Sequence, residues 1–158
     1  MGLHKYLFCK GGAVQRPILQ SVNIFAQGDN RQQVMVILQC EGREYSGRSE
    51  SSPSEEDNLT AIALATLDAL LQYLPMPVKF ELKRAAKMQP DTLTNYLLVV
   101  MVELTYKKER FSLTGTCLSD DANLTYNIAK ATLDATNRLV EYLLTREDEP
   151  TEETPIEE

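Results

Sequence analysis

The chain has 158 residues, of which 43% are hydrophobic, and a formal net charge of −7 at pH 7. This length suffices for one compact domain that needs no disulfide or metal to fold. The charge excludes the basic surface of a nucleic-acid-binding protein, so we expect no nucleic acid partner. No apolar run reaches the 18 residues of a membrane span, and we expect a cytoplasmic protein without membrane contact.

The charge is concentrated at the C-terminus. Residues 146–158 hold seven acids and one base, whereas residues 1–145 hold 16 acids and 15 bases. Acidic, proline-containing segments bury too little apolar surface to become ordered. We therefore predict an N-terminal arm over 1–20, a single pseudo-symmetric domain over 21–145, and a disordered acidic tail over 146–158.

The sequence repeats itself at an offset of 66 residues. The matching blocks are 34–38 with 100–104, Tyr45-Ser46 with Phe111-Ser112, and 65–69 with 131–135. Gly47 and Gly115 follow the aromatic residues at an offset of 68, and we expect the small insertions to lie in loops. Such self-similarity indicates one structural unit used twice, over about 21–75 and about 76–145.

Each repeat predicts three strands followed by a helix. Apolar alternation and β-branched residues place the strands at 21–26, 34–40 and 44–50, and again at 78–83, 96–106 and 110–118. Helices should follow Ser54-Glu55-Glu56-Asp57 and Ser119-Asp120-Asp121, which supply capping oxygens and negative charge. The fold class is therefore α+β, an internally duplicated βββα–βββα arrangement with antiparallel sheets packed against two helices.

The helices are apolar over more than the face that one sheet can cover. Leu64, Leu67 and Leu71 form a second stripe on the first helix, and the second helix has a similar one. We infer that the two helices touch each other or helices of a second chain. Asp68 and Asp134 occupy equivalent positions, which we predict to face water.

The central strands predict an apolar patch on the outer sheet surface. In 96–106 the even positions form a continuous inward face, yet several odd positions are apolar too. The residues that we expect at an interface are Met35, Ile37, Leu97, Val99 and Met101. An exposed patch of this kind usually marks an interface, and we expect a homodimer. The alternative is that long side chains from the strand edges fold over the patch.

No catalytic or metal-binding constellation is recognisable in the sequence. His4 is the only histidine and has no second ligand at metal spacing. Cys9, Cys40 and Cys117 are an odd number at wide spacings, so we expect them to be reduced. The glycine-rich run 10–13 does not have the lysine and hydroxyl of a phosphate loop at the required spacing. We expect no enzyme, no metal and no cofactor.

The order of elements resembles that of a known regulatory domain. A third strand with the pattern Tyr45-x-Gly47 or Phe111-x-x-x-Gly115, leading into an alanine-rich helix, is similar to the C-terminal domain of 2-isopropylmalate synthase. The resemblance covers about 21–145 and implies a domain that dimerises and binds an amino acid near the loops before the helices. The ligand-binding residues that it implies are Ser52, Ser54, Ser119 and Asp120. The segment 49–57 is longer than the family's glycine-containing turn.

A double-stranded-RNA-binding module has a similar succession of strands, glycine and helix. Such modules bind phosphates with lysines at the start of the last helix. Here Glu55, Glu56 and Asp57 occupy that place and would repel phosphates.

The sequence therefore predicts a non-enzymatic ligand-sensing or dimerisation domain that binds a small metabolite between the two repeats. The alternative is a protein–protein interaction or adaptor protein with no small ligand.

Overall fold

A computed structural model describes residues 16–91 and 94–148, the last two by their backbone alone. The strands of the first repeat are β1 (Ile18–Ala26), β2 (Gln32–Cys40) and β3 (Arg43–Ser51), followed by helix α2 (Glu55–Tyr73). The second repeat has β4 (Lys79–Met88), β5 (Tyr96–Tyr106) and β6 (Glu109–Ser119), then the 3₁₀ turn η1 (Asp121–Asn123) and helix α3 (Leu124–Asp148). The predicted α+β fold with two βββα units is confirmed.

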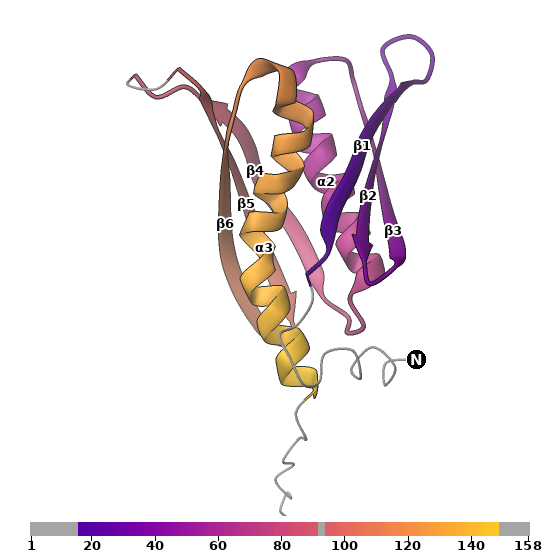
Figure 1. Cartoon of the computed structure of the whole chain (residues 1–158), viewed down its shortest axis with the longest axis vertical. Helices are drawn as coiled ribbons and strands as arrows, with labels where there is room; N and C mark the ends of the chain where they lie inside the picture. The colour runs from indigo at the N-terminus through magenta and orange to yellow at the C-terminus, as the bar shows by residue number, and fades with distance from the viewer. Residues whose placement is uncertain (1–15, 92–93, 149–158) are drawn as a thin grey trace, which may run out of the picture.

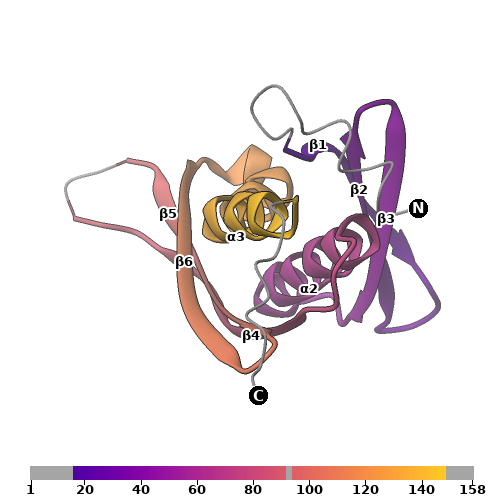
Figure 2. The ribbon, with the colours of Figure 1, turned by 90° about the horizontal axis from the view of Figure 1, so that it is seen from below.

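The strands form two separate antiparallel sheets, one for each repeat. Sheet A has the order β1-β2-β3 and sheet B the order β4-β5-β6. The two helices lie side by side between the sheets, with α2 against sheet A and α3 against sheet B (Figures 1 and 2). Each helix also contacts the first strand of the other repeat, α2 with β4 and α3 with β1.

The two repeats share one hydrophobic core. Its largest cluster combines Val36 and Ile62 of the first repeat with Val100 and Ile128 of the second, all almost inaccessible to solvent. Leu67 and Leu133 are buried in the same cluster, which confirms that the helices touch each other. Neither repeat could bury this surface alone, so the two repeats depend on each other for their core.

The strands alternate as the sequence predicts. In β5 the even positions from Leu98 to Tyr106 are buried against the helices, while the odd positions face outward. The predicted bounds of β5 are those observed, and β1, β2, β3 and β6 extend one to three residues beyond theirs. β4 begins one residue later and ends five residues later than predicted. β1 begins at Ile18, so the domain starts three residues earlier than predicted.

The prediction that insertions lie only in the loops is wrong. The hairpin turns at Glu41-Gly42 and Lys107-Lys108 are both two residues long. From the first residue of the third strand, however, Gly47 is four residues along β3 and Gly115 is six residues along β6. The second hairpin is thus two residues longer in each strand. A two-residue change preserves which side chains face the core, so the sheet can absorb it.

Several expectations concern residues outside the described part of the chain. The residues 1–15 of the expected arm, His4, Cys9 and the acidic tail beyond 148 belong to this group. Residues 146–148, which we expected in the disordered tail, are the last residues of α3 instead. Within the described ranges, no helix is long and apolar enough to cross a membrane.

Candidate functional site

The repeated Ala-Thr-Leu-Asp-Ala block brings a helix against the third strand of its sheet. A Cβ atom on Gly47 would collide with the backbone of Ala65 and Ala69, and one on Gly115 with the backbone of Ala131 and Ala135. These glycines therefore serve a close approach of two backbones and not a turn. The repeat signature is explained by packing.

The aspartates of the same block bind the strand backbone. Asp68 Oδ2 accepts a hydrogen bond of 3.0 Å from the Arg48 N–H, and Asp134 Oδ2 accepts an equivalent 3.0 Å bond from the Thr116 N–H. β3 and β6 are edge strands, so each carboxylate occupies an N–H that would otherwise be open to another strand. Asp134 is exposed as predicted, Asp68 is half-buried, and each has a specific structural partner.

The four residues that the resemblance implies for ligand binding make local hydrogen bonds. Ser54 caps α2 by accepting the Asp57 N–H at 3.2 Å, and the Ser52 hydroxyl donates to the Asp57 carboxylate. Asp120 accepts the Asn123 N–H at 3.1 Å, while buried Ser119 donates to the Asp120 carbonyl. Capping accounts for these contacts, and ligand binding at these residues stays a prediction.

Two side chains of sheet B connect the starts of the two helices, which lie at the same end of the molecule (Figure 1). Lys87 of β4 forms a 2.9 Å ion pair with Glu55, and its ammonium lies 4.3 Å from the ring centre of Tyr96. The hydrogen bond with Glu55 raises the pKa of Lys87, and the bond to Asp121 raises the pKa of Tyr96. The starts of the two helices are therefore linked through Lys87 and Tyr96.

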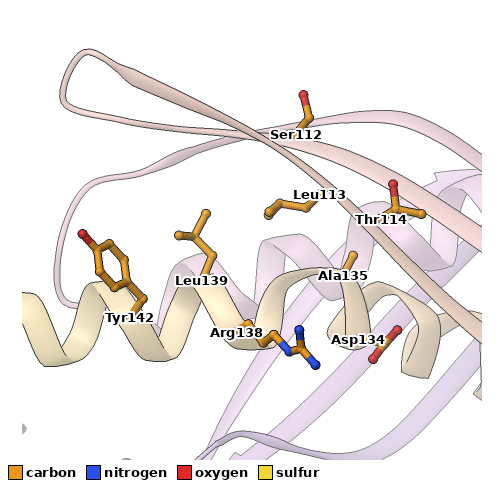
Figure 3. A pocket seen from close by; sticks show the side chains of 8 residues that line it. All are labelled: Ser112, Leu113, Thr114, Asp134, Ala135, Arg138, Leu139 and Tyr142. Atoms are coloured by element: carbon orange, nitrogen blue, oxygen red, sulfur yellow. The ribbon is translucent and has the colours of Figure 1, made fainter.

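Two open grooves run along α3 on either side of Asp134. The larger one, about 510 Å³, lies between α3 and β6 and is built entirely from the second repeat (Figure 3). Leu113, Ala135 and Leu139 lie between the strand and the helix, while the side chains of Arg138 and Asp134 extend from the same side of α3 (Figure 3).

The smaller groove, about 430 Å³, lies between the two repeats. β1 contributes Ile18 and Leu19, and the remaining walls come from β6 and α3. The residues from β6 and α3 are Thr116, Cys117, Tyr126, Lys130, Leu133, Asp134 and Asn137. The Tyr126 hydroxyl donates to the Leu19 carbonyl at 3.3 Å and thereby links the walls. Volumes of roughly 300–1,000 Å³ are typical of small-molecule sites.

One of the residues that line this groove, named here the inter-repeat groove, has an unsatisfied polar atom. Asn137 Oδ1 is buried and has no hydrogen-bond partner among the described residues. A buried acceptor without a donor costs about 1–3 kcal/mol, so a ligand donor at this position would be favourable.

The inter-repeat groove also combines opposite charges. Lys130 supplies an ammonium and Asp134 a carboxylate, one helical turn apart on α3. Burial raises the pKa of the neighbouring Cys117 thiol, which therefore stays protonated at neutral pH. Within residues 16–91 and 94–148, Cys117 is a free thiol.

The first repeat does not reproduce this polar set. At the helical offset of 66, Leu64 and Leu71 occupy the positions of Lys130 and Asn137. Their side chains are 42% and 40% exposed on α2. Lys130 and Asn137 of the inter-repeat groove therefore have no polar counterparts on α2.

The five predicted interface residues lie on outward faces, but on two different sheets. Met35 and Ile37 are half-buried on the outer face of sheet A, and Leu97, Val99 and Met101 are on the outer face of sheet B. Because the helix pair separates the sheets, the two groups do not form a single patch (Figure 2).

The sequence analysis missed the inter-repeat groove. Lys130 and Asn137 stand at i and i+7 on the exposed side of a helix, a pattern that ordinary solvated residues share. The contrast with Leu64 and Leu71 in the aligned repeat is the one signal that sets them apart.

No family model matches the chain, and no curated protein is significantly similar to it. Across residues 16–91 and 94–148, no group of three or more His, Cys, Asp or Glu side chains is arranged to hold a metal ion.

Proposed function

We propose that this chain is a non-enzymatic sensor domain that binds a small zwitterionic metabolite, such as an amino acid, between its two repeats. The observation that carries the proposal is the buried Oδ1 of Asn137, which has no partner among the described residues and belongs to a side chain that lines the inter-repeat groove. An ammonium group would satisfy this oxygen and lie near the Asp134 carboxylate, whose Oδ2 is already held by the Thr116 N–H.

The remaining groups of the groove suit the other half of such a ligand. Lys130 would pair with the ligand's carboxylate, and its ammonium already lies 5.8 Å from the ring centre of Tyr126. The side chains of Leu19 and Leu133 provide an apolar surface for a ligand side chain. Charge and shape together favour a zwitterion over a simple anion or cation.

The position of the groove explains how a ligand would act on the whole domain. Its walls come from β1 of the first repeat and from β6 and α3 of the second. A molecule bound there would hold the two repeats together and oppose their separation. Sensing would then consist of a gain in stability and rigidity that a partner can detect.

Thermal unfolding against a panel of amino acids and 2-oxo acids tests this proposal. A ligand that binds only the folded state raises the midpoint of thermal unfolding. At a ligand concentration of 100 times its Kd, the free energy of unfolding increases by about 2.7 kcal/mol. We expect an amino acid to raise the midpoint to saturation. The corresponding 2-oxo acid, which lacks the ammonium group, should have a much smaller effect.

Variants that carry the residues of the first repeat provide the specificity control. Lys130→Leu and Asn137→Leu should abolish the shift, whereas Arg138→Gln, which changes only the larger groove, should retain it. A panel without any active compound would contradict the proposal, as would a shift that both leucine variants preserve.

A further inference from the structure

The outer faces of the two sheets differ at equivalent positions, although the sheets have the same construction. Both first strands carry a β-bulge at the corresponding point, after Leu19 in β1 and after Leu82 in β4. The paired residues of the two sheets can therefore be matched row by row. The bulges align β1 with β4, and Gly47 and Gly115 align β3 with β6. This comparison shows what the second repeat adds to the shared fold.

Two of three outward rows become more apolar from sheet A to sheet B, and the third keeps an apolar residue on its central strand. Phe25, Gln33 and Glu50 correspond to Met88, Leu97 and Leu118. Asn23, Met35 and Arg48 correspond to Ala86, Val99 and Thr116. Ser21, Ile37 and Ser46 correspond to Arg84, Met101 and Thr114. We name the six apolar residues of sheet B, which are Met88, Leu97, Leu118, Ala86, Val99 and Met101, the sheet-B patch.

The sheet-B patch is accessible to solvent. Met88 is 53% exposed, Leu118 52% and Met101 42%. At three of the six positions sheet A is polar, with Asn23, Gln33 and Glu50 in place of Ala86, Leu97 and Leu118, so the fold does not require apolar residues there. Contiguous exposed apolar surface of this kind marks an interface.

The edges of both sheets are poorly suited to pairing with another strand. β1 and β4 are interrupted by their bulges, and β3 and β6 each have an N–H occupied by a helix aspartate. Assembly by edge pairing is therefore hindered at all four edges. Face-to-face packing of the sheets is the remaining route for the patch.

We propose that the sheet-B patch is the interface at which two copies of this chain pair face to face across a two-fold axis. The charges beside the patch have both signs, with Lys79, Arg84 and Arg110 against Glu81 and Glu103. A two-fold axis packs the sheet-B patch of one copy against the sheet-B patch of the other. It also lets acids of one copy meet bases of the other. Arg84 has no ion-pair partner within the described ranges and is free for such a contact.

The size of the face agrees with a second copy as the occupant. Strands of 10 and 11 residues, at about 3.4 Å per residue and about 4.8 Å spacing, give a face of roughly 35 Å by 14 Å. The flat area of this face is roughly 500 Å², and the side chains that stand out from it make its accessible area larger. The face thus approaches the ~800 Å² that one partner contributes to a standard interface.

Sedimentation velocity from about 1 μM to about 1 mM tests the proposal without any added ligand. The unmodified chain should sediment as a dimer at the upper concentrations. The double variant Leu97→Gln with Leu118→Glu places on sheet B the residue types that sheet A has at Gln33 and Glu50. It should yield a monomer with an unchanged circular dichroism spectrum. The matched control, Phe25→Glu with Met35→Lys on sheet A, should remain dimeric.

Three results would overturn the proposal: an unmodified chain that is monomeric throughout, a dimer that survives the sheet-B substitutions, or a dimer lost through the sheet-A substitutions. Should the double variant fail to fold, Met101→Arg introduces a charge at the same face and should give the same monomer. Because the assay contains no metabolite, its outcome is independent of the proposed ligand binding.

Discussion

The two repeats of this chain share the same interior packing contact but differ in their surface residues. Both use a glycine on the third strand, two alanines on the helix and an aspartate that binds the strand backbone. On the surface, the second repeat has a polar groove where α2 shows Leu64 and Leu71, and an apolar sheet face where sheet A has Gln33 and Glu50. Duplication thus preserved the packing contact and left the surfaces free to specialise.

The largest effect should come from the shared contact. Gly47→Ala or Gly115→Ala would place a methyl group against helix backbone, which no rotamer change relieves. We expect each to destabilise the domain by about 3 kcal/mol or more, measured by urea unfolding.

Gly42→Ala is the matched control for these two variants. Its Cβ would meet open space, but its φ of +80° remains unfavourable for alanine. The expected cost is about 1–2 kcal/mol. Equal losses at Gly42, Gly47 and Gly115 would refute the role of close approach.

A smaller effect should follow from the aspartates. Asp68→Ala and Asp134→Ala each remove one hydrogen bond to the strand backbone at a partly exposed site. We expect a loss of about 1 kcal/mol for each, since neither carboxylate is fully buried. The Asn variants, which retain an acceptor oxygen, should lose less. Widely different losses in the two repeats would break the symmetry that we assign to this contact.

The smallest effect should appear at alkaline pH, where the repeats differ. Ile24 and Gln32 of sheet A occupy the positions of Lys87 and Tyr96, so only the second repeat links the helix starts. Folding raises the pKa of both groups, because Glu55 binds Lys87 and Asp121 binds Tyr96. Their contribution to stability is therefore fully present below the ordinary pKa values, about 10.4 and 10, and is lost as the pH rises through the raised ones.

Urea midpoints between pH 9 and pH 11, approximately the range in which Lys and Tyr titrate, should fall more steeply for the unmodified chain than for Lys87→Ile. Tyr96→Phe should also flatten the dependence. Parallel curves for all three proteins would show that the linkage between the helix starts contributes nothing measurable.

The sequence was sufficient for the elements and their inward faces because these depend on local periodicity. The alternation in Tyr96–Tyr106 identified the buried side of β5, and Ser54 identified the start of α2. The offset of 66 also identified the duplication, whose two units are confirmed by the topology.

The rest depends on contacts between residues distant in the chain. Leu19 and Tyr126 meet across the inter-repeat groove although 107 positions separate them. The bulges after Leu19 and Leu82 shift the strand register in a way that local patterns do not indicate. Without that register, the correspondence of Leu118 with Glu50 is hidden, and with it the contrast between the outer faces.

The most direct test of the central claim, that the second repeat specialised for a ligand, is an amide NMR titration with a mixture of natural amino acids. Strand β3 and helix α2, which do not line the groove, serve as the control for β6 and α3 in the same spectrum. We predict that shifts concentrate at Thr116, Cys117, Lys130 and Asn137. The equivalent positions Arg48, Ser49, Leu64 and Leu71 should remain unchanged. Equal shifts in both repeats, or none in either, would contradict the account.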